Sequence, residues 1–173
     1  MKVAMLIPPK DFRDESVSAM KMMFDKWGVQ TVITSYSTHD CVGSHGAVYT
    51  PGLNSARISP EDCDALLLID GSGVDSYKLY DFRPLLDTVK LFSMRGKTIA
   101  AMGNAIKVVA RANVISGVKT ALPRDEEARR LVILYHGVVS KESMEFDRGI
   151  ATLGSSDKAL AFAEFLLHKF GIT

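Results

Sequence analysis

Three short, nearly uninterrupted apolar runs constrain the fold more than any other feature of this sequence. They are KVAMLI at 2–7, DALLLID at 64–70 and KTIAAM at 97–102. A strand with one face in water alternates apolar and polar residues, whereas a strand covered on both faces is apolar throughout. Segments with a helical spacing of apolar residues separate these runs. This alternation predicts an α/β fold, doubly wound, with a mainly parallel sheet between two layers of helices.

Further elements are expected between and after these strands. The spacing of Val17, Met20, Phe24 and Trp27 places one apolar face on a helix that starts at Asp14 and stops at Gly28, and it predicts that Trp27 lies in the core. Either Ser155 or Ser156 is the expected cap of the last helix. The other expected segments are helices at 82–94, from 104, at 124–130 and over 155–171, strands at 29–36, 130–139 and 148–154, and a hairpin at 39–54.

Length and charge limit the kinds of partner that this chain can take. Its 173 residues suffice for one domain with a substantial core, and we expect a single domain over 1–173. The 21 basic and 20 acidic residues leave a formal charge of +1. Sequence-independent binding to nucleic acid or to an anionic membrane needs many uncompensated Lys and Arg residues, so neither partner is expected. The apolar run before Pro8 is too short for a signal peptide, which predicts a cytoplasmic protein.

Cysteine and histidine positions bear on metal binding. Cys41 and Cys63 are predicted to be free thiols, because their spacing fits neither a disulfide framework nor a metal knuckle. His39, Asp40 and His45 lie near Cys41, but a structural zinc site needs a second pair of ligands, which the sequence lacks. We interpret this segment as a polar hairpin with a buried thiol, and we expect no metal and no cofactor.

The stretch KTIAAMGNAIKVVARA, residues 97–112, predicts a buried strand that turns sharply into a helix. The tightest point of the turn falls on Gly103. In many enzymes such a turn is a nucleophile elbow: it lifts one side chain above the sheet, where the first amides of the helix also point. Gly103 carries no atom that can attack a substrate.

Four segments together resemble one known family. They are KDFRDESVSAMKMMFDKWGVQTVI at 10–33, GSHGAVYTPGLNSARISPEDCDALLLIDGSG at 43–73, GKTIAAMGNAIKVVARANVISGVKTA at 96–121 and DRGIATLGSSDKALAFAEFLL at 147–167. Through them the sequence resembles the DJ/PfpI superfamily, within the class I glutamine amidotransferase-like, flavodoxin-like folds. The resemblance covers essentially the whole chain and implies this fold. Members commonly form dimers or larger rings of dimers, so it also implies a homo-oligomer.

The sequence departs from the family's pattern at the positions that carry the family's peptidase, amidase or deglycase chemistry. By resemblance, the catalytic Cys would stand at Gly103, the His that follows it at Asn104, and the acidic partner at Arg13. Asp70 and Gly71 stand where the family has Pro-Gly-Gly. Because Gly103 has no nucleophile, Cys-dependent chemistry at this position is excluded, and we predict no catalytic residue there.

Two interpretations of Arg13 stay open. In one, its guanidinium and the backbone amides at the elbow hold a small anionic ligand. The candidate ligand-binding residues are then Arg13, Asp70, Gly71, Gly103 and Asn104. In the other, Arg13 pairs with Asp70 or Asp14 and fills the space of the missing Cys as a structural plug.

Three functional hypotheses follow. The first is a non-catalytic binding or regulatory module for a small anion or a protein partner. The second is a hydrolase or deglycase with a relocated catalytic group. The serines considered for this role, Ser72 and Ser76, have no His or carboxylate at a spacing that would mark a catalytic base. The third is an oligomeric, chaperone-like scaffold. The segment GSGVDS at 71–76 is not interpreted as a dinucleotide fingerprint, because its third glycine is missing and no helix is expected directly after it.

Overall fold

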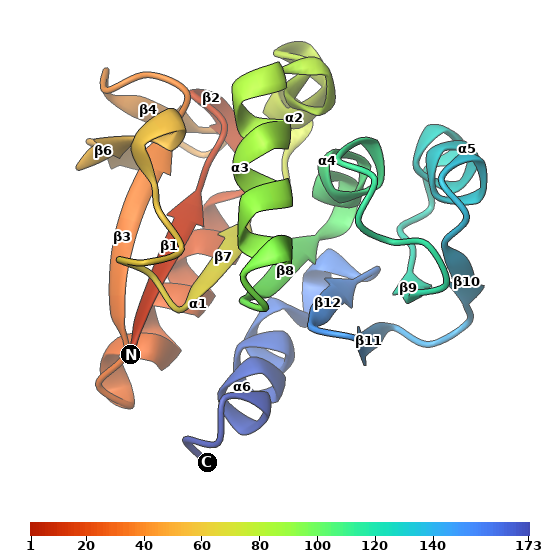
Figure 1. The fold of residues 1–173 in the computed structure, drawn as a ribbon. Helices are drawn as coiled ribbons and strands as arrows, with labels where there is room; N and C mark the ends of the chain where they lie inside the picture. Colours follow the sequence, from red (N-terminus) through yellow and green to blue (C-terminus); the bar gives the residue numbers. More distant parts are fainter.

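The structure, a computed structural model, describes residues 1–173 and is built around a seven-stranded sheet (Figure 1). The strand order is β11-β12-β8-β7-β1-β3-β6. Neighbouring strands are parallel except for β11, which is antiparallel to β12. The predicted doubly wound α/β fold is therefore confirmed. The strands are β1 Lys2–Leu6, β3 Gln30–Ser35, β6 Leu53–Asn54, β7 Ala65–Leu68, β8 Thr98–Met102, β11 Met144–Asp147 and β12 Ile150–Leu153.

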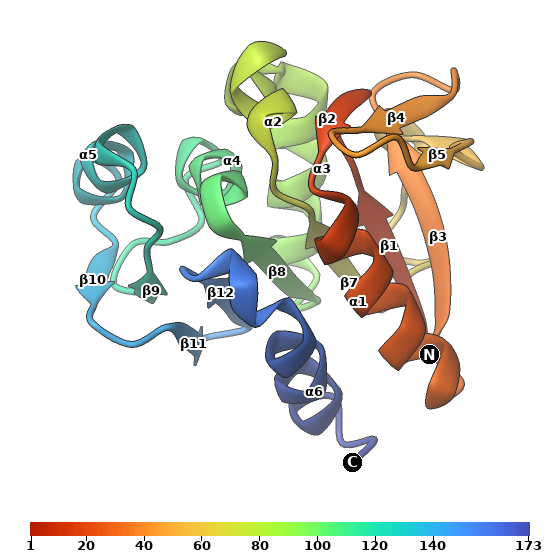
Figure 2. The same ribbon diagram turned by 180° about the vertical axis from the view of Figure 1, so that it is seen from behind.

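Two layers of helices cover the two faces of the sheet. Helices α1 (Asp14–Lys26) and α6 (Ala159–Lys169) pack on one face and lie in front of it in Figure 2. Helices α3 (Arg83–Met94) and α4 (Ile106–Arg111) pack on the other face. Successive strand residues therefore enter different cores, so that Met5 contacts the first layer and Leu6 the second. None of these helices combines the length and the apolar character needed to cross a bilayer.

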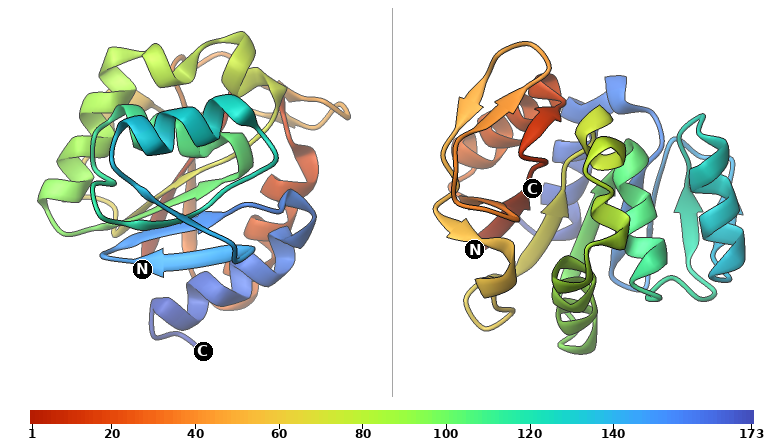
Figure 3. Two further views of the ribbon diagram at one scale, coloured as in Figure 1. Left: turned by 90° about the vertical axis from the view of Figure 1, so that its right-hand side faces the viewer. Right: turned by 90° about the horizontal axis from the view of Figure 1, so that it is seen from above.

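Two small sheets extend the central one. The first joins β2 (Lys10–Phe12), β4 (Cys41–Gly43) and β5 (Val48–Tyr49), and the antiparallel β4–β5 pair confirms the hairpin predicted within 39–54. The second pairs β9 (Lys119–Ala121) with β10 (Val138–Ser140) in parallel. These two strands and α5 (Glu126–Leu134) lie at one side of the molecule, facing the viewer in the left view of Figure 3. Strands β2, β9 and β11 were not predicted; β2 and β9 have three residues each, and β11 (MEFD) is not an apolar run.

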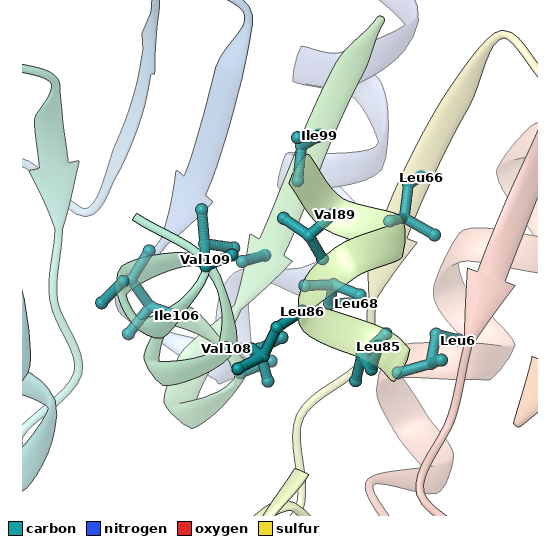
Figure 4. Packing of buried hydrophobic residues seen from close by; sticks show 14 of the residues in the cluster. Leu6, Leu66, Leu68, Leu85, Leu86, Val89, Ile99, Ile106, Val108 and Val109 are labelled. Carbon is teal, nitrogen blue, oxygen red and sulfur yellow. The ribbon is translucent and has the colours of Figure 1, made fainter. Parts of the chain in front are cut away.

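The core beneath α3 shows why the apolar runs form strands. Leu85 and Val89 of α3 pack over Leu66 and Leu68 of β7, with Ile99 of β8 beside them (Figure 4). All five side chains are at most 1% exposed. This packing confirms the helix predicted at 82–94, because its apolar face follows the helical period.

The strand predicted at 130–139 is wrong over its first half, which belongs to α5. An apolar run satisfies either period, and two local features favour the helix. The Asp125 carboxylate accepts a hydrogen bond from the Ala128 amide at 3.1 Å, which caps the helix, and Ala128 and Leu131 are buried one turn apart. His136, expected on the strand, lies in the turn that ends the helix, with φ +65°.

Two smaller predictions are wrong. Trp27 is 45% exposed, because α1 ends at Lys26 and Trp27 is its C-cap residue. Helix α2 (Ser72–Ser76) begins directly after Gly71, although no helix was expected there. Ser155, one of the two predicted caps, does stand at the N-cap of the helical turn Ser156–Lys158 that leads into α6, but its hydroxyl donates to the Asp157 carboxylate at 2.5 Å and accepts no helix amide.

Candidate functional site at the nucleophile elbow

The elbow lies where three neighbouring parallel strands end. Strands β12, β8 and β7 are adjacent in the sheet, so their carboxyl ends share one edge. Gly103 follows β8, Asp70 follows β7 by two residues, and Ser156 follows β12 by three. The topology therefore gathers these residues from three distant parts of the sequence above one point of the sheet.

Gly103 occupies a crowded position in a backbone conformation that favours glycine. Its φ is +51°. A β-carbon at this position would lie 2.8 Å from the Ser156 hydroxyl oxygen and 3.0 Å from both Cβ and Oδ2 of Asp70. The space into which an elbow side chain would project is thus filled by these two side chains.

The Asp70 carboxylate is the centre of a network that we name the Asp70 network, made of Arg13, Ser16, Asp70 and Ser156. The Ser16 hydroxyl donates to Asp70 Oδ1 at 2.7 Å, and the Ser156 hydroxyl donates to Asp70 Oδ2. Asp70 is 3% exposed. A buried carboxylate is costly unless its oxygens accept hydrogen bonds, and the two serine hydroxyls supply them.

Arg13 closes this network without an ion pair. One guanidinium nitrogen, Nη1, donates to the backbone carbonyl of Ser156 at 2.7 Å and to the Ser16 hydroxyl at 3.3 Å. The ion pair with Asp70 or Asp14, which one of the two interpretations of Arg13 expected, is therefore wrong. Two serines separate the opposite charges, because the Arg13 backbone amide is held by the Asp70 carbonyl at 2.9 Å while its side chain reaches toward Ser156.

Asn104 holds the loop that follows β7. Its side-chain amide donates to the Gly71 carbonyl at 2.8 Å, and its side-chain oxygen accepts from the Gly71 amide at 3.2 Å. Gly71 has φ +138°, and a β-carbon there would lie 2.4 Å from the Asp11 carbonyl. The Gly71 amide, one of the predicted anion donors, thus has an internal partner in this structure.

Beyond Asn104 lies a buried lysine that the sequence did not reveal. Lys107, on α4, is 3% exposed, and its ammonium group lies 2.7 Å from Asp75 Oδ1 and 2.8 Å from Asp125 Oδ2. The Asn104 amide donates to the same Asp75 carboxylate at 3.2 Å. We name Lys107, Asp75 and Asp125 the Lys107 triad; it ties α2, α4 and the start of α5 together.

Within the triad, the opposite charges of Lys107 and Asp125 stabilise each other's charged form. Burial alone lowers the pKa of Lys107, but its hydrogen bonds to Asp125 and Asp75 outweigh burial and raise that pKa above its ordinary value. Burial likewise raises the pKa of Asp125, but the bonds from Lys107 and from the Ala128 amide hold it below the ordinary value. Lys107 and Asp125 are therefore both charged at neutral pH.

The other acidic residue near Arg13 serves the hairpin. Asp14 accepts hydrogen bonds from the amides of His45 at 3.1 Å and Ala47 at 2.9 Å. These bonds, against the opposing effect of burial, lower the pKa of Asp14. The His45 ring nitrogen Nδ1 lies 2.7 Å from Glu15 Oε1. Asp14 and His45 thus fasten the β4–β5 hairpin to the start of α1.

The remaining candidates lie apart from the elbow network. Ser76 donates to the Ser72 carbonyl at 3.0 Å, and neither hydroxyl contacts a base. Cys41 and Cys63 are separate buried thiols, and burial raises the pKa of both. The structure contains no group of three His, Cys, Asp or Glu side chains placed to hold a metal ion. None of its five surface cavities is lined by Arg13, Asp70, Gly71, Gly103 or Asn104.

Comparison with known families fits this geometry. The model of the DJ-1/PfpI family matches residues 1–168. The chain belongs to the DJ-1/PfpI family. The family resemblance inferred from the elbow and flanking segments is thereby confirmed.

This DJ-1/PfpI chain is similar to individual proteins in sequence and in fold. It is 29% identical over 161 residues to an uncharacterized protein of Methanocaldococcus jannaschii, covering 93% of this chain and 78% of that protein. Among solved structures, it is similar to a ThiJ/PfpI domain protein from Brachyspira murdochii, with a TM-score of 0.90, 20% identity, and coverage of 99% and 97% of the two chains. A putative protease I from Bacteroides thetaiotaomicron gives a TM-score of 0.76 at 18% identity, again with 99% and 97% coverage. At these identities the solved structures show a shared fold.

Proposed function

We propose that this DJ-1/PfpI protein is a non-catalytic member of its family, whose elbow is a structural junction and whose scaffold serves binding. The observation that supports this is the filled space above Gly103, where the Ser156 hydroxyl and the Asp70 carboxylate stand in place of a reactive side chain. Neither Gly103 nor its neighbour Asn104 offers a nucleophile of the Cys-His type.

The same contacts bear on the kind of ligand. An anion at the elbow would meet the Asp70 carboxylate, which faces Gly103. It would also compete with Asn104 for the Gly71 amide and with the Ser156 carbonyl for Arg13. We therefore propose that the elbow is closed by the Asp70 network, and that a small anionic ligand or a protein partner binds elsewhere on the scaffold.

An activity panel with peptide amides, methylglyoxal and small esters tests the non-catalytic role. The variants are wild type, Gly103→Cys, and Gly103→Cys combined with Ser156→Ala, which removes the hydroxyl that would contact the new side chain. We expect no turnover by wild type. A thiol reagent should label native Gly103→Cys/Ser156→Ala faster than wild type, because Cys41 and Cys63 are buried. Turnover by wild type above that of a heat-inactivated sample would overturn the proposal.

One observation favours a second candidate, a hydrolase with a relocated serine. The Ser156 hydroxyl donates directly to the Asp70 carboxylate above the elbow. In such an enzyme, Asp70 would take the hydroxyl proton while Ser156 Oγ bonds to the carbonyl carbon of an ester. The protonated Asp70 would then donate to the leaving alcohol, and water would release the acid from Ser156. Ester hydrolysis by wild type that is lost in Ser156→Ala, and kept in Ser155→Ala, would favour this candidate.

A further inference from the structure

A cavity of about 460 Å³ lies on the side of the molecule away from the hairpin, at the start of α5. It is formed where two parallel strands end. Leu122 follows the last residue of β9, and Ser140 is the last residue of β10. Open α/β sheets hold ligands in crevices beyond the carboxyl ends of parallel strands. Its lining residues are Leu122, Pro123, Arg124, Asp125, Glu126, Arg129, Val139 and Ser140.

Two arginines at this cavity differ from their neighbours in having no partner. The side chains of Arg124 and Arg129 form no ion pair and no hydrogen bond with the protein. Arg130, next along α5, donates to both oxygens of Glu127 at 2.7 and 3.0 Å. Guanidinium groups with free donors are suited to grip a carboxylate or phosphate through two parallel hydrogen bonds.

The acidic residues of the cavity do not cancel this charge. Asp125 is committed to Lys107 at 2.8 Å and to the Ala128 amide at 3.1 Å, so its charge is already compensated inside the protein. Glu126 is exposed and forms no ion pair. The cavity is therefore lined by two unpaired cations, Arg124 and Arg129, and by one unpaired carboxylate, Glu126.

Part of the cavity lining is apolar. Leu122 and Val139 are half-buried and pack against the core beneath α3 and α4, and Pro123 also lines the cavity. A cavity lined by apolar side chains and a few charged groups selects a ligand with an apolar body and a charged end.

We propose that the cavity between β9, β10 and the start of α5 binds a small organic anion, with its carboxylate or phosphate on Arg124 and Arg129 and its apolar part on Leu122 and Val139. This inference deepens the binding role proposed above and rests on it. It moves the anion site away from the elbow, to residues outside the set predicted from the sequence.

Calorimetric titration with phenyl phosphate and with inorganic phosphate tests this site. We expect phenyl phosphate to bind more tightly, because its ring would contact the apolar side chains of Leu122 and Val139. The variant Arg124→Gln/Arg129→Gln should weaken it at least about tenfold, since it loses charge-assisted hydrogen bonds. The matched control is Arg130→Gln, on the same helix but outside the cavity, which should bind as wild type does. Circular dichroism verifies that each variant is folded.

Amide chemical-shift mapping with phenyl phosphate locates the binding. Shifts at 122–126, 129 and 139–140 support the proposal. Shifts confined to 13, 70–71 and 103–104 would overturn this site while leaving a binding role at the elbow. Equal affinity in the double variant, or no binding by any variant at about 10 mM ligand, would also overturn it. Turnover by wild type in the activity panel would instead overturn the non-catalytic role and leave this titration result standing.

Discussion

The hydroxyl oxygen of Ser156 lies 2.8 Å from the point that a β-carbon on Gly103 would occupy. Residue 156 follows β12, the last strand in the sequence, and residue 103 follows the neighbouring strand β8, so 52 intervening residues separate two groups in direct contact. The absence of a side chain at residue 103 therefore leaves the space that the Ser156 hydroxyl occupies.

Replacing Ser156 should destabilise the fold. Ser156→Ala leaves the buried Asp70 carboxylate with one hydroxyl donor in place of two, and the free energy of unfolding should fall by about 1 to 3 kcal/mol. Urea denaturation measures this change. The matched control is Ser155→Ala, whose hydroxyl contacts only the exposed Asp157, and it should leave the midpoint unchanged. Equal midpoints for both variants and wild type would contradict the role given to Ser156.

Gly103→Ala separates backbone strain from crowding. The positive φ alone costs about 1 kcal/mol or more for a residue with a β-carbon. Gly28→Ala is the comparison, because Gly28 has φ +72° but no atom within 4 Å of its β-carbon position. We expect Gly103→Ala to lose clearly more stability in urea than Gly28→Ala. Similar losses would mean that Ser156 and Asp70 yield easily.

Lys107→Met should destabilise the fold. It leaves the carboxylates of Asp75 and Asp125 without their shared cation, but their side chains are 44% and 23% exposed, so the free energy of unfolding should fall by about 1 to 3 kcal/mol. Chemical denaturation measures the loss. Lys107→Met/Asp75→Asn/Asp125→Asn should recover part of it, because no unpaired charge remains. A triple variant less stable than Lys107→Met would contradict this account.

The triad also predicts how stability depends on pH. Asp125 has a folded-state pKa below its ordinary value of 3.8, so its contribution is present above that value and is lost as pH falls through the lowered pKa. Lys107 has a raised pKa, so its contribution is present below the ordinary value of 10.5 and is lost as pH rises through the raised one. Thermal midpoints measured from about pH 5 to pH 3 should fall less for Asp125→Asn than for wild type. Parallel curves would show that Asp125 is not the titrating group.

The homo-oligomer implied by the family resemblance stays a prediction. Size-exclusion chromatography with light scattering should give at least twice the 18.9 kDa mass of one chain. A single-chain mass across the concentration range would contradict it, and with it the hypothesis of an oligomeric, chaperone-like scaffold.

The sheet and most of its helices were predictable because their signals are local. The run DALLLID and the spacing of Leu85 and Val89 encode buried positions directly. The site was predictable in part: the sequence placed Gly103 at the elbow and Asp70 near it. Ser155 and Ser156 were interpreted as alternative helix caps, although two serines shortly after the strand next to the elbow strand are a signal that topology could have used. Lys107 was not identified, because its partners Asp75 and Asp125 lie 32 residues before and 18 after it, and no period links them.

Two of the wrong predictions have different physical causes. The run RLVIL fits a strand or a helix equally well, and the Asp125 cap, a local interaction, favours the helix. One of the two interpretations of Arg13 was an ion pair with Asp70 or Asp14, but the Ser16 hydroxyl and the Ser156 carbonyl accept its hydrogen bonds instead. Ser156 comes near Arg13 through the order of the strands in the sheet, and a linear pattern does not contain that information.

The side chains that fill the elbow also determine the order in which substitutions at residues 103 and 156 can be tolerated. A single mutation that puts Cys at position 103 meets the Ser156 hydroxyl and the Asp70 carboxylate, so it disturbs the fold before it can supply a nucleophile. A smaller residue at 156 would have to come first, and by itself it weakens the protein. Each substitution alone is therefore expected to be disfavoured, so a cysteine elbow in this protein requires the change at residue 156 as well as the change at residue 103.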